Sequence, residues 1–368
     1  MRIMKSSLEV VEKLNMRRKV TLQRTNLTQK YEIIETEEVS KNNLKTLCLH
    51  NGRWDFLSGP IVGHPAQILV PPEECSEVEQ VLNSEHISFK VVEKNVQRML
   101  DESKKNEFPR LKEGSISYHK YMTLSEIYAY LDNLGKRYPN LASVQNIGYS
   151  TEGRPIKVVK ISSGGENKPV IFVDATMHAR EWIAPSAALF LIDQLTGNKR
   201  NRDLVDDVDW YVIPVVNVDG FEYSHTTDRM WRKTRSDIGH SKCKGVDGNR
   251  NFPFHWDGTF ESKPCFLTYP GKVPMSEPEV QALINFTETI KDRMKLYVSI
   301  HTFGPDLLYP WGYTETPLED EDDLKSLGDK AVAAVKAASG TNFSCGSIMD
   351  LMCEYSLQII HFHLYLRT

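Results

Sequence analysis

The sequence predicts an α/β protein whose central sheet is covered by helices, with a small α+β unit before it. Apolar, β-branched runs typical of strands buried on both faces support the larger part, and helix-like segments lie between them. Short strands and short helices alternate within residues 31–103, which sets this first unit apart. A polar, charged stretch follows it, so we expect two domains joined by a linker.

The composition excludes several classes of protein. The chain has 368 residues, enough for two compact domains, and 40% of them are hydrophobic. No apolar run approaches the length of about 18 residues that a membrane-spanning helix needs, so we expect no membrane association. The 45 basic and 49 acidic residues give a net charge of −4, which argues against a nucleic-acid partner. Six cysteines allow one or two disulfide bridges in a secreted protein but not a disulfide scaffold.

Residues 1–30 are expected to form a basic arm, to which we assign no function. Charges interrupt its first half every few residues, so it lacks the apolar core of a secretory signal. A short amphipathic helix is the alternative to a solvated arm.

The first unit, residues 31–103, has the pattern of a small α+β domain. We expect strands at 31–36, 67–70 and 86–94, and helices at 75–85 and 95–105. Residues 104–112 then form a polar linker around Pro109. Its exposed basic residues are sites for a trypsin-like protease: Lys104, Lys105, Arg110 and Lys112. An ordinary interdomain connection is the simpler alternative.

The second unit, residues 113–350, begins with a well-marked helix. Thr123 and Glu126 form a capping box, and the helix is expected to end near Pro139. Buried strands are predicted at 155–163, 168–176, 209–220 and 295–302, and helices at 184–197, 277–293 and 321–340. Gly197 and Gly340 are expected to end two of these helices.

His178 and Glu181 are the sharpest chemical feature. They lie three residues apart where the strand at 168–176 gives way to a helix, and on its first turn both side chains would point the same way. His301, at the end of another strand, would complete the His-His-Glu set of a catalytic zinc site. The alternative is a partly buried histidine hydrogen-bonded to a carboxylate, which the spacing alone favours.

A basic segment between these elements suggests an anionic ligand. It contains Arg229, Arg232, Arg235, Asn249 and Arg250 in an otherwise neutral chain. Because a guanidinium matches a carboxylate in bidentate geometry, Asn249 and Arg250 are candidates for holding a substrate carboxylate. A solvated loop paired with surface acids is the alternative.

Four strings in this region carry a family resemblance: HAREW, WRKTRS, GVDGNRNF and SIHTFGPDLLYPWGY. Their order and spacing resemble those of the zinc metallocarboxypeptidases of the pancreatic procarboxypeptidase A/B type, from about Tyr31 to about Asp350. The resemblance implies a mixed eight-stranded sheet flanked by helices, preceded by an activation domain that shields the active site until the linker is cleaved. It also implies a monomeric, secreted protein, although no signal peptide is visible.

The resemblance also assigns roles to single residues. His178, Glu181 and His301 match ligands of one zinc ion. Asn249 and Arg250 match the pair that binds the substrate's C-terminal carboxylate, and Arg180 a secondary substrate contact. Arg232 matches the arginine that stabilises the oxyanion. Cys243 and Cys265 match a disulfide of the family.

The end of the chain departs from the family pattern. Residues 351–368 form a divergent tail, so the catalytic domain, residues 113–350, is expected to be incomplete. In the final LYLRT, Tyr365 stands where the family has its general-base glutamate. A tyrosine is a poor base at neutral pH because its pKa is near 10.

We therefore expect a zinc carboxypeptidase precursor that removes C-terminal amino acids from peptides and proteins, with doubtful activity in this chain. An inactive zinc protein that binds C-terminal tails or inhibitors is the first alternative. An unstable fragment that lacks its closing strand is the second. A-type and B-type specificity are not distinguishable from the sequence.

Overall fold

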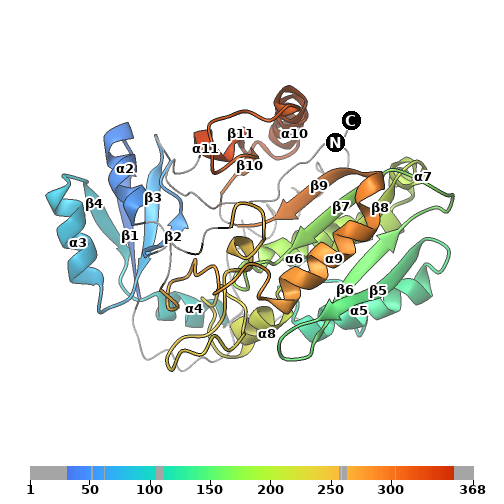
Figure 1. The fold of residues 1–368 in the computed structure, drawn as a ribbon, viewed down its shortest axis with the longest axis horizontal. Coiled ribbons are helices and arrows are strands. Elements are labelled where there is room, and N and C mark those ends of the chain that lie inside the picture. Colours follow the sequence, from blue (N-terminus) through green and yellow to red (C-terminus); the bar gives the residue numbers. More distant parts are fainter. Residues whose placement is uncertain are drawn as a thin grey trace.

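The computed structural model describes residues 31–50, 53–61, 63–104, 112–256, 258, 263–302 and 304–351. The basic arm at 1–30, most of the linker and the tail beyond Leu351 lie outside this range. Figure 1 shows the N-terminal unit, in blue, beside a larger unit whose strands run from green to orange.

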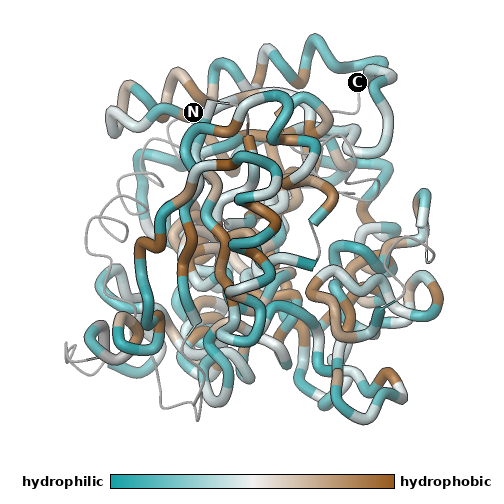
Figure 2. Tube along the Cα trace, turned by 90° about the vertical axis from the view of Figure 1, so that its left-hand side faces the viewer, coloured by the Kyte–Doolittle hydropathy of each residue, from teal (hydrophilic) through white to brown (hydrophobic). Residues whose placement is uncertain are grey.

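The N-terminal unit is a four-stranded antiparallel sheet with helices. The strand order is β2-β3-β1-β4. The strands are β1 (Glu32–Glu38), β2 (Asp55–Ser58), β3 (Pro65–Val70) and β4 (Phe89–Glu93), and the helices are α2 (Lys41–Leu49), α3 (Cys75–Ser84) and α4 (Val96–Lys104). Figure 2 views the molecule from the side of this unit, where brown hydrophobic and teal hydrophilic positions both occur. Ile34, Leu47, Ile68 and Leu82 are fully buried and form its core.

Two elements of this unit were not predicted. Helix α2 has only a short apolar side, and its start depends on Ser40, whose hydroxyl accepts a hydrogen bond from the backbone N–H of Asn43. Strand β2 has four residues, too few for a clear alternation of apolar and polar positions.

The larger unit contains a five-stranded mixed sheet in the order β5-β6-β8-β7-β9. The strands are β5 (Ala142–Tyr149), β6 (Pro155–Ile161), β7 (Val170–Ala175), β8 (Asp209–Ile213) and β9 (Met294–Ile300). Strand β7 lies between β8 and β9 and runs parallel to both, whereas β5, β6 and β8 pair antiparallel. The predicted mixed sheet is therefore confirmed, with five strands of the expected eight in the described residues.

Helices cover this sheet, as expected. They are α5 (Leu124–Arg137), α6 (Ile183–Gly197), α7 (Asp203–Asp206), α8 (Val218–Thr226), α9 (Pro278–Ile290) and α10 (Glu321–Ser339). Helix α6 packs on β6 to β9, and α5 and α9 pack on β5. The predicted capping box of α5 is present: Thr123 accepts from the N–H of Glu126, and Glu126 accepts from the N–H of Thr123.

The remaining elements form a separate group near α10. Strands β10 (Asp306–Tyr309) and β11 (Ser344–Ser347) pair in parallel, and α11 (Ile348–Leu351) follows. Gly340 ends α10 with a φ of 79°, as predicted, because a left-handed residue favours glycine. None of the helices in the described residues is long and apolar enough to cross a membrane.

Two element predictions in the larger unit were wrong. The strand expected at 209–220 ends at Ile213, because Pro214 lacks the N–H that continued pairing needs, and Asn217 then caps α8. Gly197 is the last residue of α6 rather than its cap, a position that Asn198 takes in an extended conformation.

Candidate metal centre and substrate site

The ends of two neighbouring parallel strands place the predicted metal ligands together. Strands β7 and β9 pair with Ala175 opposite Ile300, so their carboxyl ends lie side by side. His301 follows β9 directly, and His178 follows β7 after two residues. The sheet therefore brings together residues that lie 123 positions apart in the chain.

His178, Glu181 and His301 form a close set of three donors. Their candidate ligand atoms all lie within 4.8 Å of one another. The Nδ1 atom of His178 is 2.8 Å from Oε1 of Glu181, and the Nδ1 atom of His301 is 3.1 Å from Oε2 of the same carboxylate. His178 and Glu181 are buried, and the side chain of His301 is 16% exposed. Two imidazoles and one carboxylate that leave a position open fit a catalytic zinc ion.

The local structure around His178 and Glu181 corrects the sequence prediction. They lie on a turn, and α6 begins only at Ile183. Thr176 has a left-handed backbone conformation with a φ of 62°, and its hydroxyl donates to the carbonyl of Pro214. The loop from Arg229 holds the turn, because Ala179 N–H donates to Arg232 O. Glu181 N–H still donates to His178 O, so both side chains point the same way without a helix.

Asp247 is a site residue that the sequence analysis missed. Its side chain is fully buried; Oδ1 lies 3.0 Å from Nε2 of His178, and Oδ2 accepts from Nε and Nη2 of Arg232 at 3.1 and 2.8 Å. An acceptor at Nε2 favours the tautomer whose Nδ1 is free to bind a metal. Asp247 lies in the string GVDGNRNF, so an acidic residue in a basic segment was the available signal.

Charge balance explains how buried carboxylates remain ionised here. Burial alone would raise the pKa of Asp247, but the Arg232 guanidinium and His178 hold that pKa well below its usual range. Burial opposes ionisation of Glu181 in the same way, and the two histidines outweigh it, so its pKa is lowered as well. The ionised carboxylates of Glu181 and Asp247 therefore favour the binding of a cation at this site.

Asn249 and Arg250 lie beside this centre on a 3-10 turn, Gly248–Arg250. Asp247 caps the turn, because its Oδ1 accepts the N–H of Asn249 at 2.9 Å. The Asp247 carboxylate thus contacts His178, Arg232 and the turn of Asn249. The sequence analysis assigned these residues to the metal, the oxyanion and the substrate carboxylate.

Arg180 contacts the N-terminal unit. Its Nη1 and Nη2 donate to the two carboxylate oxygens of Asp55 at 2.5 and 2.6 Å. Both side chains are mostly buried, so this is a bidentate ion pair shielded from solvent. Asp55 had no signal in the sequence, because only the packing of the two units places it here.

Arg229 and Arg235 pack on aromatic rings and do not lie among the candidate metal ligands. Arg229 lies over the ring of Trp182 at 3.8 Å and donates to the carbonyl of Arg180. Arg235 stacks on Tyr223 at 3.6 Å. The basic segment therefore divides into residues that support the site and residues that line it. Cys243 and Cys265 form a disulfide bond that closes this segment.

Family models match two parts of the chain. Residues 127–366 match the zinc carboxypeptidase family, and residues 31–103 match the carboxypeptidase activation peptide. The chain belongs to the zinc carboxypeptidase family. The match to the first model extends beyond Asp350, where the sequence analysis placed the end of the resemblance. This zinc carboxypeptidase is a precursor with an activation peptide, and its family removes C-terminal amino acids from peptides and proteins.

Named relatives agree with this assignment. The chain is 37% identical to carboxypeptidase A1 of Mus musculus over 343 residues, which cover 89% of this chain and 81% of the relative. It is 42% identical to carboxypeptidase B of Astacus astacus, over 63% of this chain and 76% of that one.

Solved structures agree as well. Carboxypeptidase A from Helicoverpa armigera superposes with a TM-score of 0.82 at 28% identity, covering 90% of this chain and 84% of that one. The structure of thrombin activatable fibrinolysis inhibitor gives a TM-score of 0.73 at 28% identity, with coverages of 92% and 90%.

Proposed function

We propose that His178, Glu181 and His301 hold the one zinc ion of this metallocarboxypeptidase. The convergence of three closely spaced donors at the ends of two parallel strands carries this proposal. When bound, zinc polarises the scissile carbonyl and lowers the pKa of the attacking water. Asp247 keeps His178 in the tautomer that presents Nδ1, and thereby sets the geometry of the donors.

Arg232 is placed to stabilise negative charge on the substrate's carbonyl oxygen. Asp247 fixes its guanidinium through two hydrogen bonds, so little reorganisation is needed during the reaction. Its side chain is 15% exposed, which leaves part of the guanidinium accessible to a substrate.

Asn249 and Arg250 would bind the C-terminal carboxylate of the substrate. An amide and a guanidinium supply charge-assisted hydrogen bonds to a carboxylate, and their turn lies next to the donors. Arg180 would contribute a further substrate contact once Asp55 is removed.

The ion pair between Asp55 and Arg180 supports a zymogen mechanism. A carboxylate of the activation domain occupies a guanidinium that we assign to the substrate, so the precursor blocks its own site. Cleavage between Lys104 and Lys112 by a trypsin-like protease would release this contact. The Cys243–Cys265 disulfide supports action outside the cell, where disulfides persist.

The activity of this chain depends on its general base. Tyr365, outside the described residues, stands in the sequence where the resemblance places a glutamate. A general base contributes about 10²- to 10⁴-fold to the rate. We therefore propose that the chain binds peptide C-termini but hydrolyses them slowly, which keeps the inactive binding protein as the second candidate function.

Turnover of an N-terminally blocked chromogenic peptide separates these functions. The trypsin-treated chain should release little amino acid, whereas Tyr365→Glu should raise the rate by about 10²-fold or more and Tyr365→Ala should not. Peptides with a free C-terminal carboxylate should also bind more tightly than the same peptides with a C-terminal amide, in every variant. Rapid hydrolysis by the unaltered chain would refute the role of Tyr365, and equal binding of acids and amides would refute the carboxylate clamp.

A further inference from the structure

A cavity lies outside the proposed metal centre and carboxylate clamp. It has a volume of about 550 Å³, and its lining comes from two loops, with residues 236–239 and Val246 on one and Lys272, Ser276 and Glu277 on the other. None of these residues belongs to the proposed site. The mechanism proposed above leaves the cavity without a role.

Glu277 places a buried carboxylate in the wall of this cavity. Its side chain is 2% exposed, and its two oxygens accept from the hydroxyl groups of Thr234 at 2.5 Å and Ser276 at 2.8 Å. Both donors are neutral, and within the described part of the chain no cationic side chain forms an ion pair with it. The buried ammonium of Lys233 interacts with this carboxylate electrostatically without forming an ion pair with it. A buried carboxylate is normally paired directly with a cation, so Glu277 has capacity to bind one.

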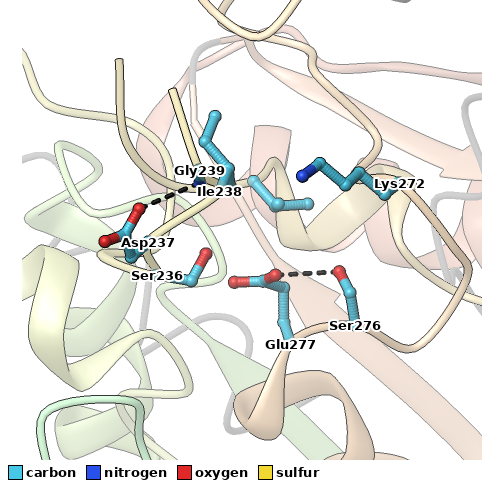
Figure 3. Close-up of a pocket in the computed structure, with 8 residues that line it drawn as sticks. Ser236, Asp237, Ile238, Gly239, Lys272, Ser276 and Glu277 are labelled. Carbon is cyan, nitrogen blue, oxygen red and sulfur yellow. Dashed lines mark hydrogen bonds between the residues drawn. The ribbon is translucent and has the colours of Figure 1, made fainter. Parts of the chain in front are cut away.

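Lys272 brings the opposite charge to the same cavity. Its ammonium group lies over Gly239, 3.4 Å from the point where a Cβ atom would stand. Figure 3 shows this group pointing over the cavity, above Glu277 and Ser276 in that view. The described residues give Lys272 no ion-pair partner either. The lining thus carries the negative groups of Asp237 and Glu277 and the positive group of Lys272, and no ion pair among the described residues joins Lys272 to either acid.

We propose that this cavity binds the zwitterion of a free α-amino acid. The ligand's ammonium group would meet Glu277 and the hydroxyl of Ser236, and its carboxylate would meet Lys272. Ile238 and Val246 provide apolar surface for its side chain. A zwitterion satisfies both charges with one molecule, whereas a simple cation or anion leaves one of them unmatched.

The chain's own reaction would supply this class of ligand. Each cleavage by a carboxypeptidase releases one free amino acid, so the cavity would respond to product concentration. Only this link to turnover depends on the proposed function, because amino-acid binding needs no hydrolysis.

Titration calorimetry of the full chain with L-leucine tests the proposal. The Arg250→Ala variant removes the proposed clamp, so heat that remains in it reports on the cavity. In that background, Lys272→Ala and Glu277→Gln should each weaken binding by about tenfold or more. Lys330→Ala, an exposed position on α10, is the matched control and should leave binding unchanged.

Two analogues test the need for both charges. Leucinamide lacks the carboxylate, 4-methylpentanoate lacks the ammonium group, and each should bind at least about tenfold more weakly than leucine. Undiminished leucine binding in Lys272→Ala would overturn the proposal, and so would complete loss of binding in Arg250→Ala alone. Neither result would contradict the proposed carboxylate clamp. If circular dichroism shows that Glu277→Gln is unfolded, the surface variant Lys272→Ala decides.

Discussion

At the scale of single residues, Asp247 connects the parts of the proposed active site. One buried carboxylate contacts His178, Arg232 and the N–H of Asn249. Its effect on each partner differs: it orients the imidazole, fixes the guanidinium and caps the turn that carries the clamp.

The first prediction concerns zinc affinity. His178→Ala should abolish stoichiometric zinc binding, and Asp247→Asn should weaken it by roughly 10- to 100-fold, because it disturbs the orientation of His178 without removing a ligand. Competition with a chromogenic chelator measures both. Asp203→Asn, at an exposed position, is the matched control. Unchanged affinity in Asp247→Asn would contradict the role assigned to it.

The second prediction concerns Glu279, a buried carboxyl group at the start of α9. Its side chain is 1% exposed, its Oε1 accepts the N–H of Thr151, and its Oε2 has no partner among the described residues. Burial raises its pKa to about 7, and the nearby carboxylates of Glu277 and Asp219 add to this effect.

The sign of the pH dependence follows from that shift. Between pH 4.5, the ordinary pKa of this group, and about 7, the folded chain holds the proton of Glu279 and the unfolded chain does not. The free energy of unfolding should therefore fall as the pH rises through this window, by on the order of 3 kcal/mol from this group.

Glu279→Gln should remove this contribution. Denaturant unfolding at pH 5 and pH 8 should show a smaller loss of stability in Glu279→Gln than in the unaltered chain. Glu288→Gln changes an exposed carboxylate on the same helix, with 59% of its side chain accessible, and serves as control. Identical pH dependence in all three proteins would show that Glu279 ionises normally.

At the scale of elements, the pairing of β7 with β9 positions the metal donors. Asp174 on β7 is fully buried and accepts hydrogen bonds from the hydroxyl groups of Tyr297 and Ser299 on β9. These contacts join the two strands just before His178 and His301. The spacing of the donors therefore depends on a carboxylate that contacts neither histidine.

The third prediction tests this dependence. Asp174→Ala leaves two hydroxyl groups without their acceptor, which should cost roughly 1 to 3 kcal/mol of unfolding free energy for each, and it should also weaken zinc binding. Tyr297→Phe removes one contact and should show a smaller loss in both measurements. A loss of stability with unchanged zinc affinity would mean that Asp174 supports the sheet alone.

At the scale of the whole molecule, the N-terminal unit contacts the larger one through the ion pair between Asp55 and Arg180. The two units have separate hydrophobic cores, so each can persist after the linker is cut. We propose that one cleavage in the linker releases Arg180 from the carboxylate of Asp55.

The fourth prediction is that limited trypsin digestion cuts first between Lys104 and Lys112. Mass spectrometry of the early fragments identifies the site, and Asp55→Ala should let the N-terminal fragment dissociate faster after the cut. Arg53→Ala, which changes an exposed residue near the start of the same strand, is the control. An initial cut inside residues 31–103 would show that this boundary is wrong.

The sequence by itself determined the class of fold, the main buried strands and the identity of the candidate donors. Strands β6, β7 and β9 and helices α5, α6 and α10 have strong local patterns, because apolar periodicity and capping depend on neighbours in the chain. The strings around His178 and Asn249 carried the family resemblance, because such a resemblance is read from residues that are adjacent in the chain.

Only the tertiary structure decided which residues meet. The turn at His178 is held by Pro214 and Arg232, which lie far along the chain, so the local pattern wrongly predicted a helix there. Asp247 and Asp55 had no distinctive spacing, and their roles come from burial beside His178 and Arg180. A carboxylate acquires such a role when folding removes water and leaves a fixed partner within hydrogen-bond distance, and sequence spacing does not encode that arrangement.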